Sequence, residues 1–431
     1  MFKVFNKSTF KDNFINAVLT LLPLSFIAGN TIINLNILVL ILSIFCFYGK
    51  KVLQIKYYFL DKLIFLFFFL ILLTGVINDI SFIIKEAWMP KFYTIMKSLA
   101  FLRFLFLYLA IRFFVENNKI NFKLFFISCS LFSIFVAFDI FIQLIFGKDI
   151  FGHENAGRHF SGPFGNEYIA GGYLQRFSIF AFFLIPIFYQ KNLRKKLNFI
   201  LPILFLVFFI AIIVSGNRMP LILFLFCVSL IVIFQKQTRK YLISFFITFS
   251  FLFFLIFQLN LNVQNNFKNF YNQVSQMTKI IISKDFKNSQ APPYFKEFES
   301  FYDTWLLHKY IGGGIKSFRY NCHFRQNIDR NSKFICNMHP HNYYLEILTE
   351  TGLVGFFIVL TIFILTIYLS FYRKFFTNLA IKDNQVITPF IFLFIVEIFP
   401  LKSTGSFFTT SNSTYFFIIF SILVALSRKN N

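Results

Sequence analysis

The chain has 431 residues, of which 57% are hydrophobic and 14% charged, and its mean hydropathy is +0.67. A soluble domain is nearer half apolar and a quarter charged, so this composition excludes an ordinary soluble protein and indicates a membrane protein. The net charge of +24 does not indicate nucleic-acid binding, because most Lys and Arg residues stand in short clusters between apolar runs, as topology determinants do.

The apolar runs predict an all-α polytopic fold, since about twenty apolar residues are needed to cross a hydrocarbon layer of ~30 Å. The basic N-terminus has no clear cleavage site after it, so its apolar run is interpreted as a retained first helix. About twelve spans are expected, at approximately residues 14–29, 31–48, 58–78, 97–115, 123–146, 172–190, 198–214, 217–234, 241–259, 352–371, 386–401 and 412–427.

The short connections predict the orientation of these spans. Counting from a cytoplasmic N-terminus places every basic connection on the cytoplasmic side, as the positive-inside rule requires; these connections are 49–56, 116–123, 191–196, 235–240, 372–376 and the tail 427–431. The polar segment 260–351 then lies outside, together with connections near 79–96, 147–171, 215–217 and 402–411. The expected organisation is nine helices in 1–259, one large, partly helical periplasmic loop in 260–351, and helices 10–12 in 352–431.

Two arginines stand at the outer ends of predicted spans. Arg176 stands near the end of the Gly- and Pro-containing stretch 157–177, a few residues inside a predicted span; the irregular backbone of this stretch would be tolerated where it lines a cavity. It could bind phosphate or form a structural salt bridge with Glu167 or Asp139. Arg218 follows a Ser-Gly-Asn turn, and a guanidinium is the natural bidentate partner of phosphate. The alternative is an arginine that reaches the outer interface and does no more.

The segment YIGGGIKSFRYNCHF, residues 310–324, adds positive charge to the large loop through Lys316 and Arg319, and Arg325 follows it directly. Its glycines are a weak signal for a phosphate cradle, because no strand leads into them. The sequence contains no Walker motif, no G-x-G-x-x-G after a strand and no H-E-x-x-H, so nucleotide hydrolysis and zincin chemistry have no support.

Cys322 and Cys336 lie in this same polar segment. If the segment is outside the cytoplasm, a disulfide between them would close a loop of roughly fifteen residues and add about 3 kcal/mol to stability. His323, His339 and His341 are near in sequence and make a zinc site the alternative. The spacing contains no C-x-x-C pair, so we expect a disulfide and no metal.

The stretch CNMHPHNYYLEILTETGLVGFF, residues 336–357, concentrates rare polar residues where the loop returns to the membrane. Pro340 suits the first position of a helix and would place His341 in the first turn, where the helix dipole favours a neutral imidazole. Such an imidazole can act as a general base. Asn342 would share a helix face with Glu346, which could contact a sugar or orient a partner. The alternative is a polar re-entry segment with a capped helix.

Three further charged residues are expected near the extracytoplasmic surface of the membrane that the spans cross: Arg103, Glu397 and Lys402. We expect ion pairs or interface anchoring from them.

These motifs resemble the O-antigen ligase and polymerase superfamily over roughly residues 150–357. The similarity rests on His341-Asn342 followed by Gly352 and Gly355, and on the stretches SGNRMPL, FGNEYIAGGYLQR and GGGIKSFRYNC. The resemblance implies glycosyl transfer without metal or cofactor, at the periplasmic face of the bacterial inner membrane, from a glycan carried on undecaprenyl diphosphate. The acceptor would be lipid A–core in a ligase, or another lipid-linked glycan in a polymerase.

The resemblance also implies residue roles. His341 matches the catalytic base, Arg218 matches a diphosphate-binding arginine, and Arg319 is our choice for a further basic residue of the loop. A single base without paired carboxylates favours direct displacement with inversion. The long loop and its cysteine pair favour a ligase over a polymerase. Two competing functions are a lipid-linked sugar flippase, which predicts inverted repeats and charges at mid-membrane depth, and a non-catalytic role in envelope assembly.

Overall fold

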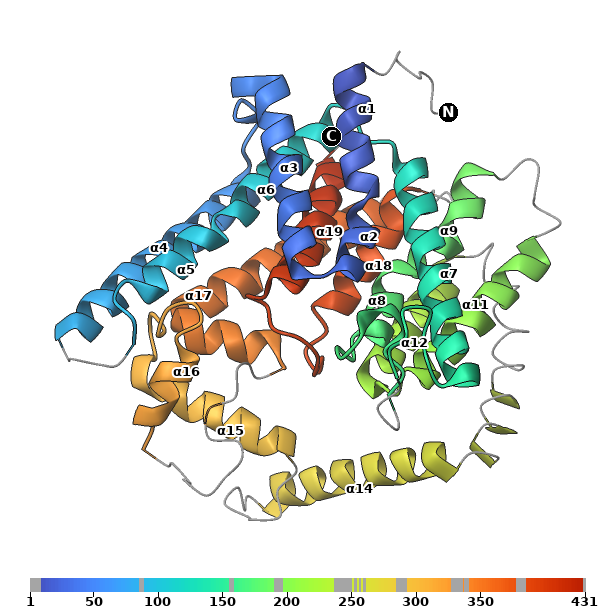
Figure 1. The fold of residues 1–431 in the computed structure, drawn as a ribbon. Coiled ribbons are helices and arrows are strands. Elements are labelled where there is room, and N and C mark those ends of the chain that lie inside the picture. Colours follow the sequence, from blue (N-terminus) through green and yellow to red (C-terminus); the bar gives the residue numbers. More distant parts are fainter. Residues whose placement is uncertain are drawn as a thin grey trace.

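The structure is a computed structural model that describes residues 9–84, 89–154, 159–189, 197–235, 250–251, 254–255, 257–258, 261–283, 293–326, 336, 341–376 and 385–428. Within these residues the fold is helical and contains no β-strand, only one isolated β-bridge between Lys148 and Glu154 (Figure 1). The predicted all-α fold is therefore confirmed.

The helices follow one another with short connections through most of the chain. They are α1 (Phe10–Thr20), α2 (Leu22–Ala28), α3 (Asn30–Tyr48), α4 (Phe59–Ile84), α5 (Tyr93–Phe101), α6 (Arg103–Glu116), α7 (Phe122–Phe146), α8 (Ala170–Phe177), α9 (Ile179–Phe188), α11 (Leu197–Val214), α12 (Arg218–Phe234), α14 (Leu261–Ser283), α15 (Pro293–Trp305), α16 (Phe318–Asn321), α17 (Tyr343–Ile367), α18 (Ile387–Glu397) and α19 (Thr410–Arg428).

Seven helical segments among the described residues are long and apolar enough to cross a membrane: Asn30–Val52, Phe59–Ile80, Tyr93–Glu116, Phe122–Phe146, Ala170–Phe188, Tyr343–Arg373 and Thr410–Arg428. Three shorter apolar helices accompany them, at Ile200–Val214, Arg218–Phe234 and Ile387–Glu397. The chain is thus a multi-pass membrane protein, while the count of about twelve spans stays a prediction. Most of the expected span 241–259 lies outside the described residues, and the expected first span is divided into α1 and α2.

The two ends of the bundle differ in what they carry. Figure 1 shows the start of α1 and the end of α19 at one end, and α14, α15 and α16 at the other. Helix α19 is buried along most of its length between the surrounding helices, where its phenylalanine rings stack on those of α6 and α18 and contact a ring of α4 at a tilt. The segment expected to form a large loop therefore has helices of its own, as its sequence predicts.

The main chain of residues 309–314, in the polar segment, crosses that of α17 and is hydrogen-bonded to it. Helix α17 is interrupted at Gly352, whose φ of 67° and ψ of −171° are not helical. The interruption removes intrahelical hydrogen bonds, and residues 309–314 replace them. The N–H groups of Gly313 and Gly314 donate to the carbonyls of Thr349 and Glu350 at 3.1 and 2.9 Å, and those of Leu353 and Val354 donate to Lys309 and Tyr310 at 2.9 and 3.1 Å.

Only glycine fits on either side of this crossing. A Cβ atom on Gly352 would lie 2.3 Å from the Tyr310 carbonyl oxygen, and one on Gly312 would lie 2.4 Å from the Glu350 carbonyl. Both contacts are with backbone atoms, which cannot swing aside as a flexible side chain can. The glycines that the sequence offers as a weak phosphate cradle are used here for close approach of two main chains.

Candidate functional site

A group of buried polar side chains gathers where α8, α17, α18 and α19 meet. We call Arg176, Tyr343, Glu397, Lys402 and Asn412 the outer charge cluster. The Nη2 atom of Arg176 lies 2.8 Å from Glu397 Oε1 and 2.7 Å from Asn412 Oδ1. The Lys402 ammonium and the Tyr343 hydroxyl donate to the same Glu397 oxygen at 2.5 and 2.6 Å.

Two cations in this cluster share one carboxylate. The side chains of Arg176, Lys402 and Glu397 are 12%, 3% and 1% exposed, so water screens their charges poorly. Burial lowers the pKa of Lys402 to about 7, an effect that the Glu397 carboxylate opposes and Arg176 reinforces. Lys402 and Glu397 thus form an ion pair, as expected of them.

The sequence-based alternative for Arg176 names the wrong partners. Its salt bridge is with Glu397, which is 221 residues away in the chain, and with neither Glu167 nor Asp139. Asp139 instead accepts the backbone N–H of Ile150 at 2.8 Å. The helix α8 ends one residue after Arg176, which sets the guanidinium toward the starts of α17 and α19.

The start of α17 brings the predicted catalytic motif to this cluster. Asn342 is the N-cap, because its Oδ1 accepts from the N–H groups of Tyr344 and Leu345 at 3.0 and 3.2 Å. Its Nδ2 donates to the Pro400 carbonyl at 2.8 Å and so ties α17 to the connection between α18 and α19. The first helical residue, Tyr343, belongs to the outer charge cluster.

His341 lies just before the cap, with a φ of 52°, and is half-buried. The prediction that it occupies the first turn is therefore wrong, because Asn342 caps the helix, which begins at Tyr343, three residues later than a start at Pro340. His341 still lies at the positive, N-terminal end of α17, where an imidazolium is disfavoured. His339 and Pro340 lie outside the described residues.

Glu346 is held by a second group of contacts. Lys316 Nζ lies 3.3 Å from Glu346 Oε1 and 2.9 Å from the Ser406 hydroxyl. Ser406 and the backbone N–H of Phe407 also donate to the Glu346 carboxylate. This carboxylate therefore links the polar segment, α17 and the connection before α19.

Lys316, and not Arg319, is the cation of the 310–324 segment that enters the site. Arg319 is exposed on the short helix α16, whereas Lys316 turns inward with a φ of 63°. The two lie three residues apart, and the sequence contains no feature that distinguishes them.

Arg218 is the first residue of α12 and is half-buried. The turn before it packs on the start of α8: Asn217 Nδ2 donates to the Tyr168 carbonyl at 2.6 Å, and a Cβ on Gly171 would lie 2.5 Å from Ser215 Oγ. The two predicted phosphate-binding arginines, Arg176 and Arg218, are thus carried by helices in direct contact.

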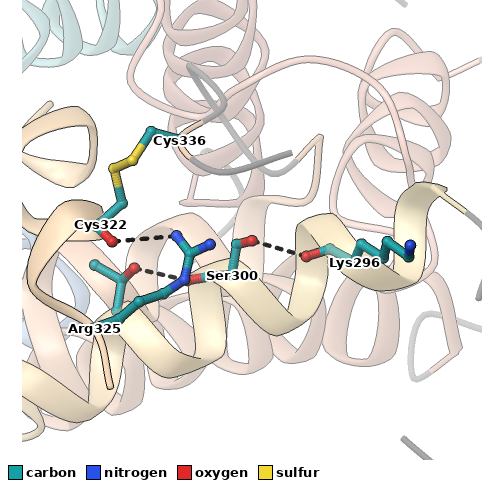
Figure 2. Close-up of a disulfide and its surroundings, with 6 residues drawn as sticks. Lys296, Ser300, Cys322, Arg325 and Cys336 are labelled. Atoms are coloured by element: carbon teal, nitrogen blue, oxygen red, sulfur yellow. Dashed lines mark hydrogen bonds between the residues drawn. A yellow bond between two sulfur atoms is a disulfide. The ribbon is translucent and has the colours of Figure 1, made fainter. Parts of the chain in front are cut away.

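Cys322 and Cys336 form a disulfide with a Cα–Cα distance of 5.7 Å (Figure 2). Arg325 Nη1 donates to the Cys322 carbonyl at 3.2 Å beside it. His323 is near enough to both sulfurs for a three-ligand metal group, but sulfur atoms joined to each other are not thiolate ligands. The bond attaches the chain five residues before His341 to the end of α16.

Tyr343 and Asn412 are the site residues that sequence reasoning misses. Tyr343 directly follows the His341-Asn342 pair, so its position next to that motif was the signal available. Asn412 belongs to the polar run TTSNST at the start of an apolar helix, and that run was the signal available.

The fold and these clusters define a multi-pass helical membrane protein with a buried polar site at one end of its bundle. Residues 203–360 match the family model described as O-antigen ligase. The matched segment includes Arg218, Lys316, His341 and Glu346. No curated protein matches the chain.

Proposed function

We propose that the protein transfers an O-antigen-like glycan from undecaprenyl diphosphate to a sugar hydroxyl of lipid A–core at the periplasmic face of the inner membrane. The observation that carries the proposal is the start of α17. There His341 immediately precedes the N-cap Asn342, and Tyr343 hydrogen-bonds the carboxylate that holds Arg176 and Lys402. A candidate base that lies within the segment matching the O-antigen ligase model is therefore joined, through Tyr343, to a cluster with surplus positive charge.

The positive groups suit a diphosphate leaving group. Arg176 and Arg218 come from contacting helices, and the N-terminus of α17 adds the positive end of its dipole. Fixed positive groups in a poorly hydrated site stabilise the charge that develops on the departing diphosphate. The proposed reaction needs no cofactor, because a diphosphate whose charge is offset is already a good leaving group.

His341 would accept the proton of the attacking hydroxyl as that oxygen bonds to the anomeric carbon and the diphosphate departs. Glu346 is a poor candidate for a covalent nucleophile, because Lys316, Ser406 and the Phe407 N–H occupy its carboxylate. A single base, with the Glu346 carboxylate occupied in this way, supports one displacement with inversion at the anomeric carbon.

The first test is His341→Ala, with His323→Ala as the control, since His323 is an exposed histidine outside the site. We expect His341→Ala to abolish transfer of glycan to lipid A–core while membrane insertion is unchanged, and His323→Ala to retain transfer. Normal transfer by the His341 variant would overturn the proposed role. Arg218→Lys should weaken donor binding, because the bidentate geometry of guanidinium is lost.

Polymerisation of the lipid-linked glycan is the second candidate, because the same family includes both reactions. A strain without the gene separates the candidates on a glycan gel. Lipid A–core without any long chain indicates a ligase, and core that carries one repeat indicates a polymerase. Lipid-linked glycan held on the cytoplasmic side would instead indicate a flippase.

A further inference from the structure

The Glu397 carboxylate pairs with two cations, Arg176 and Lys402. Arg176 alone would balance the charge of Glu397, and Tyr343 and Asn412 complete the hydrogen bonds of that pair. A buried charge that no opposite charge neutralises costs folding free energy unless another group compensates for it. A role in holding the fold together therefore accounts for Arg176 and Glu397 but not for a buried ammonium group beside them.

We propose that Lys402 is a phosphate-binding residue of the donor site, with Glu397 holding its ammonium group, and that of Arg176, in place when no donor is bound. This inference rests on the proposed function, because it assigns the surplus charge to the diphosphate of a lipid-linked donor. Lys402 follows the end of α18 by five residues, in the connection to which Asn342 is also bonded.

The Arg176 guanidinium has a nitrogen that could bind a further anion. In the part of the chain that the structure describes, the Nη1 atom of Arg176 has no hydrogen-bond partner, whereas Nη2 has three. One face of the guanidinium lies over the Tyr415 ring, with Cζ 4.8 Å from the ring centroid. The starts of α17 and α19 both contribute residues here, Tyr343 and Asn412, so two helix N-termini add positive potential.

The proposal predicts that donor binding depends on pH. The groups that face Lys402 are Glu397 from α18, Tyr343 from α17 and, through Glu397, Arg176 from α8 and Tyr415 from α19. With a pKa lowered to about 7, Lys402 is mostly charged at pH 6 and mostly neutral at pH 8. An anion binds the charged form better, so affinity should fall as pH rises through 7, and binding should take up protons near that pH.

The experiment measures binding of pyrophosphate and of a polyprenyl diphosphate to the purified full-length protein in nanodiscs, between pH 5.5 and 9. We expect Lys402→Met to weaken binding about tenfold at pH 6 and to remove the pH dependence near 7, since a charge-assisted contact is lost. Lys402→Arg should bind with wild-type affinity at pH 6 and keep that affinity at pH 8. Lys119→Met, which removes a lysine paired with Asp12 at the other end of the bundle, is the control and should bind as the wild type does.

Wild-type affinity and pH dependence in Lys402→Met would overturn the inference, and so would equal loss in Lys402→Met and Lys119→Met. Folding is checked by thermal unfolding of each variant; if Lys402→Met does not fold, the pH profile of Lys402→Arg decides by itself, and a fall in affinity through pH 7 there counts against the proposal. Glycan transfer is measured separately. Lysine-dependent diphosphate binding without any transfer by the wild type would contradict the proposed function and leave this inference standing.

Discussion

The described part of the molecule contains two contrasting buried groups of charges, at opposite ends of the bundle. At the end that holds the start of α1, Arg112 and Arg428 meet Asp61 and Glu116, two cations with two carboxylates. Tyr108 donates a further hydrogen bond to Asp61 at 2.5 Å. The outer charge cluster instead has two cations, Arg176 and Lys402, on one carboxylate.

The difference teaches how a structural group can be told from a functional one. A balanced group such as that around Asp61 satisfies its charges within the protein, and removing one member leaves another buried without compensation. A group with surplus charge is complete only when an ion of opposite sign arrives. Substitutions in the group around Asp61 should therefore lower stability, whereas substitutions in the outer charge cluster should lower donor binding and glycan transfer.

The largest effect is expected for Arg112→Leu. Arg112 and Asp61 are both 0% exposed and lie 2.6 Å apart, so the variant leaves a buried carboxylate with only Arg428 and Tyr108. We expect the free energy of unfolding in mild detergent to fall by about 3–5 kcal/mol. The double variant Asp61→Asn/Arg112→Leu should recover part of the loss; an unchanged unfolding midpoint in the single variant contradicts the structural role.

Arg176→Leu should separate function from stability. The variant leaves Lys402 paired with Glu397, so the cluster stays balanced and the unfolding free energy should change less than in Arg112→Leu. Glycan transfer should fall about a hundredfold, or about 2.7 kcal/mol in the activation free energy, because a charged contact to the diphosphate is lost. A variant that unfolds readily yet transfers glycan normally when folded would show that the outer cluster is structural after all.

The smallest effect is expected for Glu116→Gln. Its side chain is 22% exposed, and its pair with Arg112 is four residues along one helix. A partly exposed pair of this kind contributes less than about 1 kcal/mol. Chemical unfolding of the variant beside Arg112→Leu measures the difference; a loss as large as that of Arg112→Leu would mean that Glu116 is as essential to the balance as Asp61.

The sequence is informative about what depends on local pattern. Apolar runs locate the helices, and the interruption of α17 at Gly352 is visible because the residue is a glycine between polar and apolar stretches. The start of α17 is misplaced for a local reason as well. Pro340 offers one helix-start signal and Asn342 another, and the asparagine is the one whose side chain makes the capping hydrogen bonds.

The partners in the site are less predictable, because they come from distant parts of the chain. Nothing near Arg176 in the sequence indicates that its carboxylate is Glu397, and the nearer acids Asp139 and Glu167 are chemically equivalent choices. In the same way Lys316 and Arg319 differ only in which side of the 310–324 turn they occupy. Such choices are made by packing between helices, which a single sequence does not record.

The crossing at Gly352 has a consequence for protein engineering. Because four hydrogen bonds join main chain to main chain, this attachment of the polar segment to α17 depends on two glycines rather than on a pairing of side chains. A chimera that exchanges α15 would have to keep residues 309–314 and 349–354 and also the contact of α15 with α17, where Thr349 Oγ1 donates to the Phe301 carbonyl at 3.3 Å. The hydrogen bonds of this crossing thus hold the polar segment in place whatever side chains the rest of that segment carries.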